Sequence, residues 1–179
     1  GDTVVGAAEL DSEDHDLVFI SSDAQLLRFP ASLVRPQGRP AGGMAGIRLD
    51  DGARVIWFGV VDPSRPARVV TVAGSSTALP GTQVGGGKMS DYAEFPAKGR
   101  ATGGVRAQRF LKGEDELLLA WAGPAPAKAV SAVGKPVPLP EELGRRDGSG
   151  LRLTHTIGAI GGALASGPAE TPEAPPAEE

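Results

Sequence analysis

The chain has 179 residues, of which 40% are hydrophobic, and its formal net charge at pH 7 is −4. It has no cysteine, which excludes disulfide bonds and thiolate metal sites, and no apolar run of the roughly 18 residues that a membrane-spanning helix needs. These features, with no signal-peptide pattern, predict a cytoplasmic protein. Only 4% of the residues are aromatic, whereas glycine (26) and proline (16) are abundant and fall between short apolar runs. This punctuation predicts an all-β fold with a core of Val, Leu, Ile and Ala.

Acidic residues collect at the two ends of the chain. Residues 1–16 contain six acidic residues and residues 164–179 contain four, and neither stretch has a basic residue. The chain between them carries a net charge of about +6. Because the placement of charge governs attraction to a polyanion, nucleic acid is a candidate partner. The alternative is that these charges are ordinary solvated strand faces.

A basic, glycine-rich turn occurs three times, at residues 37–43, 98–104 and 144–150. Each copy contains a Gly-Arg step, follows two strand-like runs of which the second ends in proline, and precedes a further strand-like run. A repeat of roughly 40–50 residues with about four strands is typical of a propeller blade. We therefore predict an all-β, propeller-like β-pinwheel of four-stranded blades, about three of them plus a partial one.

The predicted β-pinwheel domain covers residues 1–163. Its blade repeats are expected at residues 17–61, 67–123 and 127–163. Residues 1–16, with a strand-like run at 3–10, are expected to be the end of a preceding blade. We expect residues 164–179, rich in Ala, Pro and Glu, to be a disordered acidic tail.

Two alternating runs predict where particular side chains point. Over residues 105–110, alternation places Arg106 and Gln108 on one face of a strand. Over residues 151–157, it places His155 on an apolar face, where we expect a hydrogen-bonded core histidine.

We find no catalytic constellation, metal cluster or dinucleotide-binding fingerprint in the sequence. Gly85-Gly86-Gly87-Lys88 lacks the spacing of a phosphate-binding loop, and the single tyrosine, Tyr92, is expected to be structural. His15 is expected to be a solvated loop residue, because no second histidine is near it. These features predict a binding or scaffolding module, with no metal and no cofactor of its own. A hydrolase on a propeller scaffold would need convergent carboxylates in a central channel, which no motif indicates.

The repeated turn resembles one found in a known family. Residues 95–105, with residues 37–43 and the opening run 17–30, are similar to the recurring elements of the C-terminal domains of bacterial type IIA topoisomerase A subunits, from gyrase and topoisomerase IV. The resemblance covers roughly residues 3–160. The basic box of gyrase, Gln-Arg-Arg-Gly-Gly-Lys-Gly, is not reproduced in any copy, which favours the topoisomerase IV-like version.

The resemblance implies a β-pinwheel that binds and bends duplex DNA around a basic rim and presents a DNA segment for strand passage. It implies that the partners are duplex DNA, the rest of the A subunit, plus the ATPase B subunit, with no membrane and no small-molecule ligand, and that the protein is associated with the nucleoid. Cleavage chemistry, Mg²⁺ and ATP would belong to other domains of the parent topoisomerase, so this chain alone would not be an enzyme.

The candidate DNA-binding residues are the basic residues on and beside the repeated turns. They are Arg35, Arg39, Arg48, Lys98, Arg100, Arg106, Arg109, Arg145 and Arg146, with Arg28 and Lys112 as weaker candidates. An alternative function is a propeller-like protein-interaction module, which would be favoured if these residues scattered over the surface. The acidic tail could compete with DNA for the basic rim, so its removal is expected to tighten binding.

Overall fold

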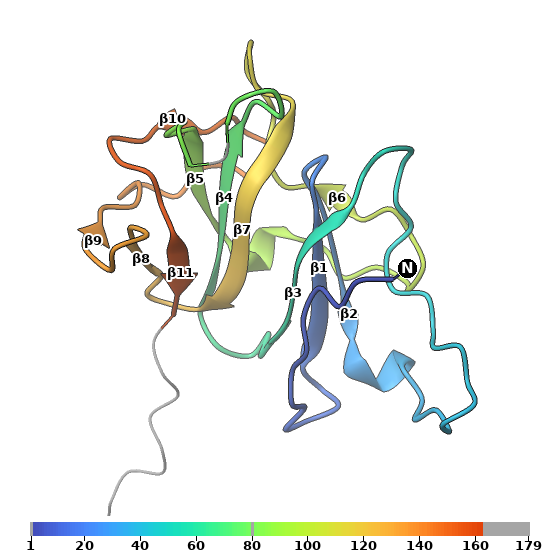
Figure 1. Cartoon of the computed structure of the whole chain (residues 1–179). Helices are drawn as coiled ribbons and strands as arrows, with labels where there is room; N and C mark the ends of the chain where they lie inside the picture. Colours follow the sequence, from blue (N-terminus) through green and yellow to red (C-terminus); the bar gives the residue numbers. More distant parts are fainter. Residues whose placement is uncertain (1, 80, 163–179) are drawn as a thin grey trace, which may run out of the picture.

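The computed structural model describes residues 2–79 and 81–162, which form three antiparallel sheets side by side (Figure 1). The only helices in this part of the chain are two short 3-10 turns, η1 (Ala31–Leu33) and η2 (Tyr92–Glu94). The expected all-β fold is therefore confirmed. No helix among the described residues is long and apolar enough to cross a membrane.

The first sheet is built on a tight hairpin of β1 (Asp16–Ser21) and β2 (Gln25–Pro30). Ala24 in the turn has a positive φ of 61°, and the side chain of Ser21 bonds to Asp23 and Gln25 around it. β3 (Val55–Val61) pairs with the free side of β1, and β6 (Val105–Arg106) pairs with β2. The strand order is β3-β1-β2-β6.

The second sheet repeats this plan, and the third repeats part of it. The second contains β4 (Ala67–Gly74), β5 (Gly86–Asp91), β7 (Glu116–Pro124) and β10 (Leu151–Arg152), in the order β10-β5-β4-β7. The third contains β8 (Lys128–Val130), β9 (Pro136–Val137) and β11 (Ala159–Gly161), in the order β11-β8-β9.

Each of the first two sheets takes its outer strand from the next repeat. β6 follows the second basic turn in sequence but completes the first sheet, and β10 follows the third turn but completes the second sheet. The sheets therefore do not coincide with the repeat units read from the sequence. The alternating pattern that predicted these strands indicates which face is buried but not which sheet they join.

The core lies between the first two sheets, with β3 and β7 adjacent at its centre (Figure 1). Small and branched side chains such as Val18, Ile20, Val69 and Leu117 are fully buried there. This placement explains how a chain with few aromatic residues still forms a core.

Three strand predictions differ from the structure. Residues 2–10 form no strand; they are exposed, and Gly6 lies against Phe58 of β3. β10 ends at Arg152, and the chain bends away from the sheet after Leu153. His155 is therefore exposed, and its ring lies within hydrogen-bond distance of the Thr154 hydroxyl. Gln108 is buried and donates to the Gly86 carbonyl at 3.0 Å, so it does not share an exposed face with Arg106. The predicted tail, residues 164–179, lies outside the described residues.

Candidate nucleic-acid interface

The second basic turn docks on the segment that follows the first. The Ala101 amide donates to the Gly46 carbonyl at 2.6 Å, and the Arg48 amide donates to the Thr102 carbonyl at 3.0 Å. The guanidinium of Arg100 also donates to the Ala45 carbonyl at 2.7 Å. Backbone and side chain thus hold residues 98–104 against residues 44–48.

The third basic turn docks on the segment after the second turn in the same way. The Arg109 amide donates to the Gly148 carbonyl at 2.9 Å, and the Arg146 guanidinium donates to the Arg106 carbonyl at 3.0 Å. Arg48 and Arg109, like Ala45 and Arg106, are 61 residues apart, so the contacts are equivalent. We call the segments joined by this repeated docking, residues 44–48, 98–109 and 144–150, the basic ribbon.

Each docked turn is also fixed to the sheet below it. The Lys98 amide donates to the Arg28 carbonyl at 3.0 Å, and the Gly144 amide donates to the Met89 carbonyl at 2.8 Å. Gly104 has a φ of 75°, and a Cβ there would lie 2.5 Å from the Leu26 carbonyl oxygen. Only glycine permits this close approach of the ribbon to β2.

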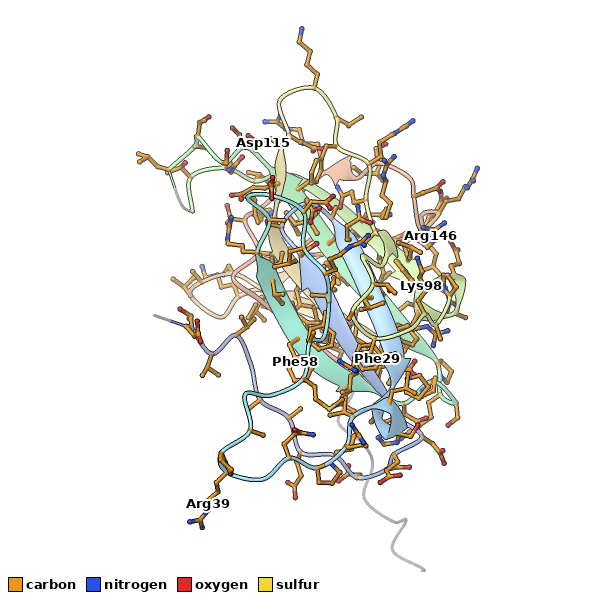
Figure 2. The ribbon with its side chains drawn as sticks, turned by 90° about the vertical axis from the view of Figure 1, so that its right-hand side faces the viewer. Phe29, Arg39, Phe58, Lys98, Asp115 and Arg146 are labelled. Atoms are coloured by element: carbon orange, nitrogen blue, oxygen red, sulfur yellow. The ribbon has the colours of Figure 1, made fainter. Side chains whose placement is uncertain are left out.

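The ribbon presents cations to solvent. Arg48, Lys98, Arg106, Arg109 and Arg145 are exposed, whereas Arg100 and Arg146 are partly covered by the docking contacts. Among the described residues, only Arg145 in this set has a carboxylate within ion-pair distance, Asp147 at 3.6 Å. Lys98 and Arg146 lie along the same edge of the molecule (Figure 2).

Carboxylates limit the positive potential at two places along the ribbon. Arg48 and Lys98 line a polar hollow of about 270 Å³ with Asp23 and Asp50. At the third turn, Glu94 accepts a hydrogen bond from the Arg146 amide at 2.8 Å. The exposed cations still outnumber the carboxylates along the ribbon.

A buried lysine, Lys88 on β5, supports the third turn from below and was not predicted from the sequence as part of the site. Its Nζ donates to the Arg145 carbonyl at 2.9 Å and to the Arg146 carbonyl. Burial lowers the pKa of Lys88 to about 8, although Asp147 and Glu94 favour its charged form. The sequence signal was a lysine in a strand at the position where the first repeat carries the apolar Leu27.

The structure separates some predicted residues from the ribbon. Arg35 and Arg39 lie in an exposed loop, and Arg39 projects from the opposite end of the molecule from Arg146 (Figure 2). Lys112 is exposed in the turn before β7 and lines a hollow with Arg152 and Glu114. DNA contact by these residues remains a prediction.

The weaker candidate Arg28 is not available as a phosphate ligand. Its guanidinium donates to Asp16 at 2.7 Å and to the Phe95 carbonyl at 2.6 Å, and it lies 4.7 Å from the centre of the Tyr92 ring. The prediction that Arg28 is a DNA contact is therefore wrong, because a buried carboxylate already neutralises it.

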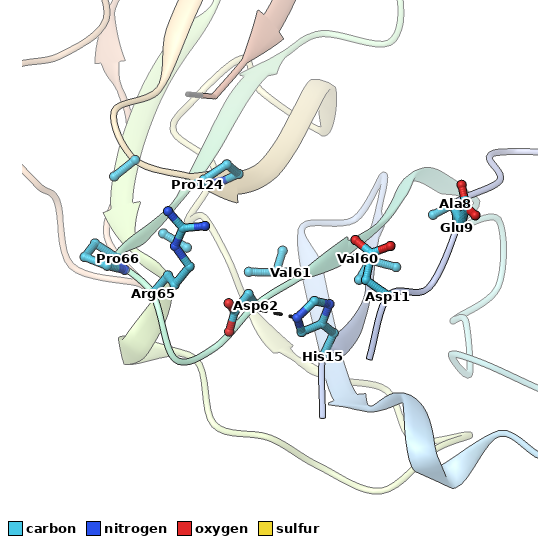
Figure 3. Close-up of a pocket in the computed structure, with 12 residues that line it drawn as sticks. Ala8, Glu9, Asp11, His15, Val60, Val61, Asp62, Arg65, Pro66 and Pro124 are labelled. Atoms are coloured by element: carbon cyan, nitrogen blue, oxygen red, sulfur yellow. Dashed lines mark ion pairs between the residues drawn. The ribbon is translucent and has the colours of Figure 1, made fainter. Parts of the chain in front are cut away.

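A separate hollow of about 470 Å³ lies where β3 leads into β4 (Figure 3). His15 and Asp62 face each other across it at 3.9 Å, so His15 is partly buried beside a carboxylate. Hydrogen bonds from Ser64 lower the pKa of Asp62 and keep it ionised. No group of three or more potential metal ligands occurs in the described part of the chain.

Comparison with known proteins identifies the family of the repeated segments. Residues 15–62 and 85–119 match the family model described as DNA gyrase C-terminal domain, beta-propeller. These two segments, which make up just under half of the chain, belong to the DNA gyrase A C-terminal domain family. The two matched segments contain β1, β2, β3, β5 and β6 and the first residues of β7, but not β4. The family resemblance seen in the sequence is confirmed.

The curated relatives of this chain are much longer proteins. The DNA gyrase A subunit of Escherichia coli K12 is 33% identical over 105 residues, which cover 59% of this chain and 11% of the relative. Topoisomerase subunit TopoM of Mycolicibacterium smegmatis is 32% identical over 109 residues, which cover 60% of this chain and 14% of the relative. The matched part of the chain thus spans about a tenth of the length of these relatives.

Solved structures of the same fold include domains from topoisomerase IV. The C-terminal domain of DNA topoisomerase IV aligns with a TM-score of 0.63 and 16% identity, over 86% of this chain and 51% of that one. The E. coli ParC C-terminal domain aligns with a TM-score of 0.60 and 19% identity, over 84% of this chain and 61% of that one. These likenesses confirm the β-pinwheel fold.

Proposed function

We propose that the basic ribbon binds duplex DNA without regard to sequence and bends it, as part of a type II topoisomerase A subunit. The observation that carries the proposal is the repeated docking, in which Arg100 bonds to the Ala45 carbonyl and Arg146 bonds to the Arg106 carbonyl. This repetition places successive basic turns in a row, as a continuous polyanion requires. The assignment to the gyrase A C-terminal domain family supports the same function.

The binding follows from phosphate neutralisation. Exposed Arg and Lys side chains displace condensed counterions from DNA, which gives an affinity that falls steeply with salt. Contacts to phosphates position a protein on DNA but carry no direct sequence information. Because bending a short site costs several kcal/mol, cations from consecutive turns must act together.

In this proposal the chain works as one part of a larger enzyme. It presents a bent DNA segment for strand passage, whereas DNA cleavage, Mg²⁺ binding and ATP hydrolysis belong to the rest of the A subunit together with the ATPase B subunit. Its place is then the cytoplasm, on the DNA of the nucleoid.

The test is binding of a mixed-sequence duplex of about 40 base pairs across a salt series. The ribbon variant changes Lys98, Arg106 and Arg109 to Ala. The control variant changes Arg65, Lys128 and Lys135, which are also exposed but lie off the ribbon, to Ala. We expect the ribbon variant to lose affinity and to reduce the salt slope by roughly 2 to 3, because each lost phosphate contact contributes about 0.9.

The control variant has the same net charge as the ribbon variant, so it separates a specific contact from general attraction. Equal losses in both variants would contradict a ribbon-centred interface. No binding by the wild type at low salt would overturn the proposal and leave the protein-interaction module as the alternative.

A further inference from the structure

The third basic turn has an anchor that the second turn lacks. Pro30 and Asp91 end equivalent hairpin strands just before η1 and η2, and Leu27 and Lys88 each lie three residues earlier. Both positions are buried: Leu27 has 0% of its surface exposed and Lys88 has 4%. The second turn therefore lies over a leucine, whereas the third lies over an ammonium group.

The ammonium group of Lys88 binds two consecutive peptide carbonyls, those of Arg145 and Arg146. Two acceptors on one donor group fix the orientation of both peptides, because the carbonyls must point into the sheet. The side chain of Arg145 is then directed outward and is 86% exposed. Gly144 favours this arrangement, since a Cβ there would be 3.0 Å from Lys88 Cγ.

We propose that Lys88 is the positioning residue of the third basic turn, holding its carbonyls against β5 so that Arg145 and Arg146 face the DNA. That these arginines face DNA rests on the proposed function, but the anchoring of the turn by Lys88 does not. The charged groups near the ammonium are Glu94 on η2 and Asp147 and Arg146 on the turn. The two carboxylates favour the charged, fully donating form of the lysine, and burial opposes it.

The experiment compares the wild type with Lys88→Met, which keeps the length of the stem and removes the donors. Amide hydrogen exchange is followed at Gly144 and Gly148 in the third turn, and at Lys98 and Ala101 in the second turn as internal references. In Lys88→Met we expect the third-turn amides to exchange roughly tenfold faster or more, because a charge-assisted hydrogen bond stabilises a closed turn by at least that factor. The second-turn amides should not change.

Duplex binding is measured on the same proteins, with Lys135→Met as a control that removes one exposed charge. We expect Lys88→Met to weaken binding to about the extent of Arg145→Ala, and by more than Lys135→Met does.

Unchanged exchange at Gly144 and Gly148 in Lys88→Met would overturn the anchor. Faster exchange with an affinity equal to that of Lys135→Met would overturn its role in binding. If the wild type binds no DNA, the proposed function fails, and the exchange contrast still decides whether Lys88 holds the turn.

Discussion

At the scale of single residues, the carboxylate of Asp16 joins three segments. It is 3% exposed and accepts hydrogen bonds from Arg28 on β2 at 2.7 Å and from the hydroxyl of Tyr92 at 2.8 Å. Burial and the Asp16 charge raise the pKa of Tyr92, so the phenol remains a proton donor over the ordinary pH range. Because Tyr92 belongs to the second repeat, this cluster links the first sheet to η2.

The stability of the fold should depend on the carboxylate of Asp16. We expect Asp16→Ala to lower the free energy of unfolding by about 3–5 kcal/mol, because it leaves the guanidinium of Arg28 buried and unpaired. Tyr92→Phe, which keeps the ion pair, should cost only about 1–2 kcal/mol. Urea unfolding measures both, and the exposed Asp14→Ala provides the control for charge. A cost for Asp16→Ala no greater than that for Asp14→Ala would contradict this account.

The buried lysine predicts a pH dependence of stability. The pKa of Lys88 is lowered from 10.5 to about 8 in the folded protein, so between these values the folded state binds fewer protons than the unfolded state. Stability should therefore rise as the pH increases from 8 toward 10.5, by up to about 3 kcal/mol relative to Lys88→Met. Denaturant unfolding of the two proteins at pH 7 and pH 10 measures the difference, in which the titration of Tyr92 cancels. A difference that stays constant or falls with pH would show that burial does not disfavour the charged lysine.

At the scale of the elements, the donated strand β6 depends on Gly104. Gly43 and Gly104 occupy the same position in successive repeats and have φ values of 82° and 75°. A Cβ at Gly43 would meet nothing within 4 Å, whereas one at Gly104 would clash with the β2 backbone. We expect Gly43→Ala to cost about 1 kcal/mol for its backbone conformation and Gly104→Ala more than about 3 kcal/mol. Denaturant unfolding of both variants tests this, and equal costs would mean that β6 can move away from β2 freely.

The repeat itself was readable from the sequence, but the exchange of strands between repeats was not. The Gly-Arg turns and the strand-like runs around them predicted equivalent units, and β2 and β5, which lie 61 residues apart, are indeed equivalent strands. A two-residue strand such as β6 carries too little pattern to identify its partner. Arg28 was misjudged and Lys88 was missed for a related reason: both are basic residues in strands, and only tertiary packing shows that one meets Asp16 and the other meets carbonyls.

At the scale of the whole molecule, the basic ribbon depends on the order of the sheets. The second and third turns each dock on the previous repeat, so their cations are aligned without any long-range ion pair between them. The first turn, at residues 37–43, is exposed and has no such docking contact among the described residues. The sequence predicted both Arg39 and Arg100 as DNA-binding residues, whereas the structure places only Arg100 on the ribbon.

The acidic residues at the end of the chain give a prediction for the electrostatics of the whole molecule. Residues 164–179 hold Glu170, Glu173, Glu178 and Glu179 and no basic residue, so deleting them brings the formal net charge from −4 to neutral. We expect the deletion to tighten duplex binding at low salt and to have little effect at several hundred millimolar salt, because screening shortens the reach of the charges to a few ångströms.

A full-length variant with the same four glutamates changed to Gln separates charge from bulk. If charge is the cause, the Gln variant should bind as tightly as the deletion, and fluorescence anisotropy of a labelled duplex measures both. Tightening by the deletion alone would indicate that the residues obstruct the ribbon sterically. No tightening in either variant would show that these glutamates do not compete with DNA.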